Sequence, residues 1–116
     1  MNTLLSKLNN LFWLFHFGDG TWRIYYENSQ LESEGSFRND KREGLWRIYN
    51  EIGQSQSEGN FKENEKDGTW RTYNENGQLK AEESFKKNEE DGLSMYYYEN
   101  GQLKAKVNWK EGLGCR

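Results

Sequence analysis

GTWRIYYENSQLESEGSF, residues 20–37, is followed at residues 44–61 by the closely related GLWRIYNEIGQSQSEGNF. The pattern returns at residues 68 and 92, so that glycine, tyrosine, glutamate and glutamine each recur every 24 residues without a gap. A fixed period of this length is typical of repeat proteins, in which each unit stacks on its neighbours. The sequence therefore predicts a repeat array over residues 20–116, with units at 20–43, 44–67, 68–91 and 92–115, preceded by a separate segment at residues 1–19.

The composition limits the kind of core and the kind of partner. Of the 116 residues, 33% are hydrophobic and 16% are aromatic, and the net charge is −3. From so polar a composition we expect a thin structure. The aromatic content is nevertheless higher than that of disordered chains. Charges of both signs alternate along the chain, so we expect no nucleic-acid partner. The lone Cys115 forms no disulfide within the chain, which agrees with our expectation of a cytoplasmic protein.

Each unit is predicted to be a β-hairpin. The tetrapeptide ENGQ, or a relative of it, lies between two alternating runs in every unit, and Asn-Gly favours a two-residue type I′ turn. With Asn76 and Gly77 as the turn, Tyr73 is placed opposite Lys80 and Arg71 opposite Glu82. The stretches RNDKRE, KENEKD and KKNEED are predicted to be exposed connections between hairpins.

Counting residues outward from the turn gives equivalent pairs in the first and second units. It places Arg23 opposite Glu34 and Arg47 opposite Glu58, and such a cross-strand pair stabilises a sheet by about 0.2–1 kcal/mol. It also places Trp22 opposite Gly35 and Trp46 opposite Gly59, where a ring covers bare backbone. The predicted fold is all-β: an elongated, single-layer antiparallel β-meander of about eight short strands.

Alternation along each strand gives the predicted sheet two faces. Tryptophans lie on an apolar packing face, and tyrosines lie in the middle of a polar face. Rows of tyrosine and tryptophan are also common in protein interfaces. We therefore take these rows as candidate partner-binding residues: Trp22, Trp46, Trp70, Tyr25, Tyr49, Tyr73 and Tyr97.

The segment 1–19 has two interpretations. Leu4, Leu8, Leu11 and Phe15 follow one stripe of a helix, which predicts a short helical cap on the first hairpin. Alternatively, Trp13 stands 24 residues before Phe37, as expected of half a decayed repeat. The apolar run 11–15 is too short to span a bilayer, which needs about 20 residues, and an exported form is left open.

The sequence shows no chemistry typical of an enzyme. His16, which lies outside the repeats, is the only histidine. Apart from it, Cys115 has no histidine that could serve as its base. The acidic residues do not follow the spacing of a calcium loop, and no phosphate-binding loop is present. We expect a protein that is not an enzyme and that has no cofactor or metal.

The third unit, DGTWRTYNENGQLKAEESFKKNEEDG at residues 67–92, resembles the second variant of the MORN repeat, the repeat of the YwqK family of toxin–antitoxin antitoxins. The matching positions are Gly68, Trp70, Tyr73, Asn76, Gly77, Leu79, Glu82 and Phe85. The resemblance covers all four units and implies an elongated, twisted β-sheet with a binding or scaffolding role. The departures from this pattern are Ser29, Ile52, Ser55 and Ser94, and from them we expect the second and fourth units to be looser.

We therefore expect a non-enzymatic protein-interaction or scaffolding module, with a cognate toxin as one candidate partner. One alternative is a cell-wall module of the choline-binding type, in which aromatic rings surround a quaternary ammonium. Another is a lipid-surface protein, against which the missing basic cluster argues. A homodimer through a sheet edge or through the apolar face is a further candidate.

Overall fold

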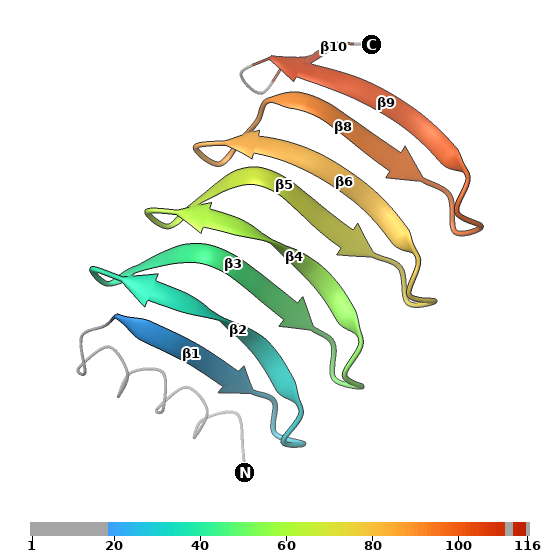
Figure 1. The fold of residues 1–116 in the computed structure, drawn as a ribbon. Coiled ribbons are helices and arrows are strands. Elements are labelled where there is room, and N and C mark those ends of the chain that lie inside the picture. The colour runs from blue at the N-terminus through green and yellow to red at the C-terminus, as the bar shows by residue number, and fades with distance from the viewer. Residues whose placement is uncertain (1–18, 111–112, 116) are drawn as a thin grey trace.

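The chain forms one antiparallel sheet in which strands adjacent in sequence are adjacent in space (Figure 1). The computed structural model describes residues 19–110 and 113–115. Its strands are β1 (Gly20–Tyr25), β2 (Leu31–Arg38), β3 (Lys41–Tyr49), β4 (Ser55–Lys62), β5 (Glu65–Tyr73), β6 (Leu79–Lys86), β7 (Glu89–Glu90), β8 (Gly92–Tyr97), β9 (Leu103–Lys110) and β10 (Leu113–Cys115).

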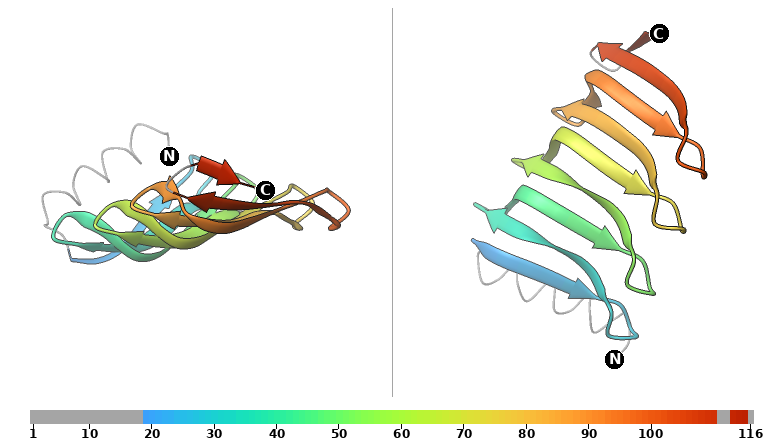
Figure 2. Two further views of the ribbon diagram at one scale, coloured as in Figure 1. Left: turned by 90° about the horizontal axis from the view of Figure 1, so that it is seen from above. Right: turned by 45° about the vertical axis from the view of Figure 1, so that its right-hand side comes forward.

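The strand order is β1-β2-β3-β4-β5-β6-β8-β9-β10, with the short β7 paired to β6. The predicted all-β meander is confirmed, and the short strands β7 and β10 are additional to the eight expected. Figure 2 shows that the described strands make a single twisted layer. The predicted helical cap falls in residues 1–18, which lie outside the described residues.

The ENGQ turn differs from the prediction. Gly77 donates its N–H to the Asn74 carbonyl at 2.9 Å, and Asn74 donates to the Gln78 carbonyl at 2.8 Å. Within this turn only Gly77 has a positive φ, of 86°, whereas a type I′ turn needs two. The loop is therefore a three-residue turn that ends in a left-handed glycine. The prediction missed this because the Asn76 side chain has another role: its oxygen accepts a hydrogen bond from the Gln78 N–H at 2.9 Å.

The type I′ geometry occurs instead in the charged connections. Both central residues of each connection have positive φ: Asn39 and Asp40, Glu63 and Asn64, Lys87 and Asn88. Side chains join successive connections, as the Asn64 oxygen accepts a hydrogen bond from the Arg42 N–H at 2.9 Å, and that of Asn88 accepts one from the Lys66 N–H at 2.7 Å. Contacts to the preceding repeat thus stabilise turns in which glutamate and lysine occupy left-handed positions that they rarely adopt.

The predicted register is correct away from the turn. Arg71 pairs with Glu82, and the same pairing recurs in the first and second repeats. Tyr73, however, pairs with Leu79 and not with Lys80, because the register shifts between Thr72 and Tyr73. The equivalent shift occurs in every hairpin, so it belongs to the repeat and not to one unit.

The core is a row of aromatic rings on one face of the sheet. Tryptophan and phenylalanine alternate across the strands, with ring centroids 4.8–6.2 Å apart. The members of this row are Trp22, Phe37, Trp46, Phe61 and Trp70. Such tilted and edge-to-face pairs stabilise a thin core beyond simple burial of area.

Trp46 and Trp70 each lie over a glycine of the preceding repeat. A Cβ added at Gly35 would come within 2.1 Å of the Trp46 ring, and one added at Gly59 within 2.2 Å of the Trp70 ring. The in-hairpin alignment of Trp46 with Gly59 is confirmed, but the expectation that this ring covers Gly59 is wrong. The ring–glycine contact therefore joins neighbouring hairpins and does not close a single one.

This contact predicts a coupling between two substitutions. Gly59→Ala should lower the free energy of unfolding by about 1–3 kcal/mol, because the Trp70 ring must move. In a Trp70→Ser background, Gly59→Ala should lower the free energy of unfolding by far less. Urea unfolding of the four proteins measures the coupling, and Ser57→Ala is the matched control because Ala81 stands at the equivalent position of the next repeat. If the losses of unfolding free energy from Gly59→Ala and Trp70→Ser simply added in the double variant, the result would contradict the contact.

A second prediction concerns the first turn. Ser29 occupies the left-handed position that glycine holds in the other repeats, with a φ of 71°. Ser29→Gly should raise the free energy of unfolding by about 1 kcal/mol, since a residue with a Cβ is strained there. Ser29→Ala should bring no such gain. Thermal unfolding of both variants would refute the turn assignment if Ser29→Gly were no more stable than the original chain.

Candidate interaction surface

The apolar face is closed by its own side chains. Trp22, Trp46 and Trp70 are only 4–6% exposed. The Arg42 guanidinium lies 4.0 Å from the Phe61 ring centroid, and the Lys66 ammonium lies 4.7 Å from that of Trp70. These cations cover ring faces that would otherwise meet solvent. The three tryptophans that the sequence brought forward as partner-binding residues thus lie within the packing of the sheet.

Two indole groups also have partners within the sheet. The Trp46 Nε1–H donates to the Ser36 carbonyl at 3.0 Å, and the Trp70 Nε1–H donates to the Asn60 carbonyl at 2.8 Å. Both acceptors belong to the preceding repeat. Each ring is therefore fixed by packing and by a hydrogen bond.

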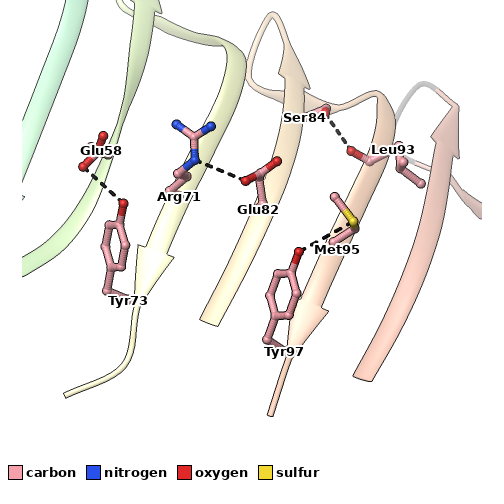
Figure 3. A network of polar contacts seen from close by, with 8 residues as sticks. All are labelled: Glu58, Arg71, Tyr73, Glu82, Ser84, Leu93, Met95 and Tyr97. Carbon is pink, nitrogen blue, oxygen red and sulfur yellow. Dashed lines mark hydrogen bonds and ion pairs between the residues drawn. The ribbon is translucent and has the colours of Figure 1, made fainter. Parts of the chain in front are cut away.

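The tyrosine row lies on the opposite, polar face. The Tyr49 hydroxyl donates to Glu34 of the preceding repeat at 3.4 Å. In the same way, the Tyr73 hydroxyl donates to Glu58 of its preceding repeat at 3.3 Å (Figure 3). Burial raises the pKa of both hydroxyls, and the charge of the glutamate partner raises it further. These groups therefore stay protonated donors at neutral pH. Tyr25, at the first strand, is 45% exposed.

The polar face also carries one line of alternating charge that crosses the sheet. Strand pairing places successive members opposite one another within and between hairpins. In order they are Arg23, Glu34, Arg47, Glu58, Arg71, Glu82, Met95 and Lys106.

Ion pairs form at two places along this line. Arg23 contacts Glu34 at 3.5 Å. Arg71 contacts Glu82 at 3.2 Å, and Figure 3 shows this second pair. The third predicted pair keeps its register, but among the described residues Arg47 and Glu58 make no ion pair within 4.0 Å. Because the arginines are exposed, each pair adds little stability, so the line matters mainly as a surface pattern.

The junction between the third and fourth repeats departs from the pattern on the apolar face at three linked positions. Ser94 replaces tryptophan, Glu83 replaces the glycine that this tryptophan would cover, and Glu90 replaces the covering cation. Ser94 is fully buried, and its hydroxyl accepts a hydrogen bond from the Ser84 N–H at 3.2 Å. The Asp91 N–H donates to the Ser84 carbonyl at 2.9 Å, the acceptor that a tryptophan would use.

These replacements bring two carboxyl groups together around one hydroxyl. Tyr96 Oη lies 3.3 Å from Glu83 and 3.3 Å from Glu90. Burial, together with the hydrogen bond and the charge of Glu90, raises the pKa of Glu83 to about 7, although Tyr96 and Lys66 act in the opposite direction. The junction between the third and fourth repeats therefore holds a proton at a pH where ordinary glutamates are charged.

Three of the large exposed apolar side chains lie in the fourth repeat, and sequence reasoning did not identify them. Leu93 is 49% exposed, Tyr98 is 51% exposed and Leu103 is 45% exposed. The sequence did carry a signal for two of them, because Leu93 and Tyr98 stand where the third repeat has the polar residues Thr69 and Asn74.

The described residues contain no group of three histidine, cysteine or acidic side chains placed to hold a metal ion. Nor does this part of the chain include a helix with the length and apolar character that crossing a membrane requires. His16 lies outside the described residues.

The raised pKa of Glu83 predicts a pH dependence of stability. Its folded-state pKa of about 7 exceeds the ordinary value of 4.5, so its proton-linked stability is complete below about pH 4.5 and is lost as the pH rises to about 7. Glu83→Gln should therefore gain stability relative to the original chain between pH 5 and pH 8. Urea unfolding across this range measures the difference, with Glu75→Gln in an exposed turn as control. A difference that does not change with pH would refute the assignment.

Comparison with known proteins agrees with the period and the register. The profile of the MORN repeat variant matches residues 18–39, 42–63, 66–87 and 90–111. These segments keep the 24-residue spacing and begin two residues before the predicted units. A search of curated protein sequences finds no significant match. The four matches cover most of the chain, and the protein belongs to the family of the MORN repeat variant.

Proposed function

We propose that this chain is a non-enzymatic protein-interaction module that binds its partner through the polar face. The observation that carries the proposal is the tyrosine row, held in place by hydrogen bonds from Tyr49 to Glu34 and from Tyr73 to Glu58. No second layer covers this face among the described residues. Tyrosines that are already ordered lose little entropy on binding, which favours their use in interfaces.

The two aromatic rows have different roles in this proposal. The buried tryptophans set the spacing between repeats, and the tyrosines with their arginine neighbours contact the partner. A partner that matches the repeat spacing would meet the same groups several times along the sheet. Binding would then be spread over a long surface and not concentrated in a pocket.

A toxin is one specific candidate partner, and the chain would then act as an antitoxin in the cytoplasm. This finer proposal rests on the resemblance of the repeat to that of the YwqK family. A rigid, extended surface suits such a role, because covering the active region of another protein requires area and not chemistry. The glutamates of the polar face support a non-enzymatic role, since Glu34, Glu58 and Glu82 each accept a bond from tyrosine or arginine.

The choline-binding alternative has less support. Its ligand would need aromatic faces open to a cation, and Arg42 and Lys66 already lie over the rings of the apolar face. Titration with choline, followed by tryptophan fluorescence, separates the two hypotheses.

The proposed function predicts loss of a partner from one defined variant. Tyr25→Ser with Arg47→Glu changes two exposed groups of the polar face. Ile52→Ser is the control, since Ile52 is 73% exposed at a turn. In affinity capture from the native cell, the original chain and Ile52→Ser should retain a common protein that the face variant loses. Retention of that protein by the face variant would overturn the proposal. Expression of the captured protein alone and with this chain tests whether it is a toxin that the chain neutralises.

A further inference from the structure

The polar face repeats one pair of groups along the sheet. On each of β1, β3 and β5 an arginine and a tyrosine stand two residues apart, and so on the same face of the strand. Figure 3 shows the pair on β5. One further strand lies between successive pairs, so each pair stands about 9.4–9.8 Å from the next along the repeat axis. The pairs are Arg23 with Tyr25, Arg47 with Tyr49, and Arg71 with Tyr73.

The arginines are the more exposed members of the line of alternating charge. The side chains of Arg23 and Arg71 are 57% and 44% exposed, whereas those of their partners Glu34 and Glu82 are 26% and 28% exposed. Arg47 is also exposed and forms no ion pair within 4.0 Å with a described residue. A ligand that approaches this face therefore meets a row of cations first, and acidic groups in the ligand would complement that row.

The spacing of the pairs distinguishes between the backbones that a ligand could present. A polyproline II helix has three residues per turn and rises 3.1 Å per residue, so every third side chain returns to the same side after about 9.3 Å. In an extended strand, side chains three residues apart point to opposite sides. In an α-helix, a side chain returns to the same face after seven residues, or about 10.5 Å. The polyproline II repeat fits the row best, with a mismatch of at most about 1 Å over three pairs.

The tyrosine row supplies the kind of surface on which prolines pack. Proline-rich segments dock on aromatic side chains, and their preformed helix loses little entropy on binding. Tyr49 and Tyr73 are half-buried and are held by hydrogen bonds to Glu34 and Glu58, and Tyr25 is 45% exposed. The row is therefore ordered before a ligand arrives, and part of each ring is open to solvent.

We propose that the polar face binds a proline-rich segment of the partner that forms a polyproline II helix with an acidic residue at every third position. The segment crosses the strands along the repeat axis. Its acidic side chains pair with Arg23, Arg47 and Arg71, and its prolines pack on the tyrosines beside them. In the fourth repeat Met95 replaces the arginine and contacts the Tyr97 hydroxyl (Figure 3), so the first three repeats select the acidic residues.

This inference rests on the proposed function, because it names the class of partner for the same face. The chain carries a net charge of −3, but charges more than about 8 Å away are largely screened at physiological salt. The exposed arginines nearest the ligand therefore decide the attraction. Because the ion pairs are exposed, binding should weaken as the salt concentration rises.

A labelled peptide tests the inference directly. The probe is a fluorescent peptide in which Pro-Pro-Glu is repeated four times, titrated with the full chain and followed by anisotropy. Arg47→Gln with Arg71→Gln should weaken binding at least tenfold. Lys62→Gln with Lys86→Gln removes the same charge from exposed lysines of β4 and β6, and should change binding less than twofold. Backbone amide shifts should be centred on β1, β3 and β5.

Two control peptides separate spacing from charge. A peptide of the same composition with all its glutamates grouped at one end should bind at least tenfold more weakly, because its acidic groups no longer match the arginines one by one. Replacing every proline by glycine should have a similar effect, since the chain then becomes a flexible coil. Failure of the periodic peptide to bind, equal binding of the periodic and grouped peptides, or equal loss in the two double variants would overturn the inference.

Capture of the native partner separates this inference from the proposed function. If Tyr25→Ser with Arg47→Glu loses the captured protein, but the periodic peptide neither binds nor displaces that protein, the proposed function stands and the inference falls. If the face variant retains the captured protein, the proposed function falls, and the inference falls with it.

Discussion

The contact between a tryptophan ring and the bare backbone of a glycine in the preceding repeat holds this sheet together. A sheet with one layer has no second layer against which to bury its apolar face, so neighbouring hairpins must bury it in one another. Trp46 and Trp70 do so by covering Gly35 and Gly59, and they hydrogen-bond to the same preceding strand. Because each contact aligns two repeats, the tyrosines and charges on the other face also come into line.

The fourth repeat shows the structural consequence of losing this contact. Without a tryptophan at Ser94, the preceding glycine is no longer required, and Glu83 occupies its place. The regular ladder shortens, since β6 pairs with β8 only at Ala81–Tyr96 and Glu82–Met95, and with β7 only at Phe85–Glu90 and Lys86–Glu89. At this boundary Ser94 and the Glu83 cluster hydrogen-bond in place of the ring–glycine contact.

Much of this architecture was predictable from the sequence, and the errors have physical causes. Period and alternation predicted the hairpins, the two faces and the pairing of Arg71 with Glu82. They placed the type I′ turn wrongly for two reasons. The Asn76 side chain accepts a hydrogen bond from the Gln78 N–H in a different kind of turn. The true type I′ turns contain residues such as Glu63 and Lys87, which do not favour left-handed backbone. The partner of each ring was also missed, since counting within a hairpin cannot reveal a contact between hairpins. The Glu83 cluster escaped prediction because its three replacements, Glu83, Glu90 and Ser94, lie on three different strands and come together only through the pairing of β6 with β7 and β8.

Amide hydrogen exchange, followed residue by residue by NMR, tests most directly whether ring–glycine contacts couple the repeats. Because protection reports the free energy of local opening, amides of β4 and β5, joined through Gly59 and Trp70, should exchange slowest and as one group. Amides at the boundary of β6 and β8, where Glu83 and Ser94 replace the contact, should open at a clearly lower free energy. Equal protection at the two boundaries, or greater protection at β6 and β8, would contradict the central role given to the tryptophan–glycine contact.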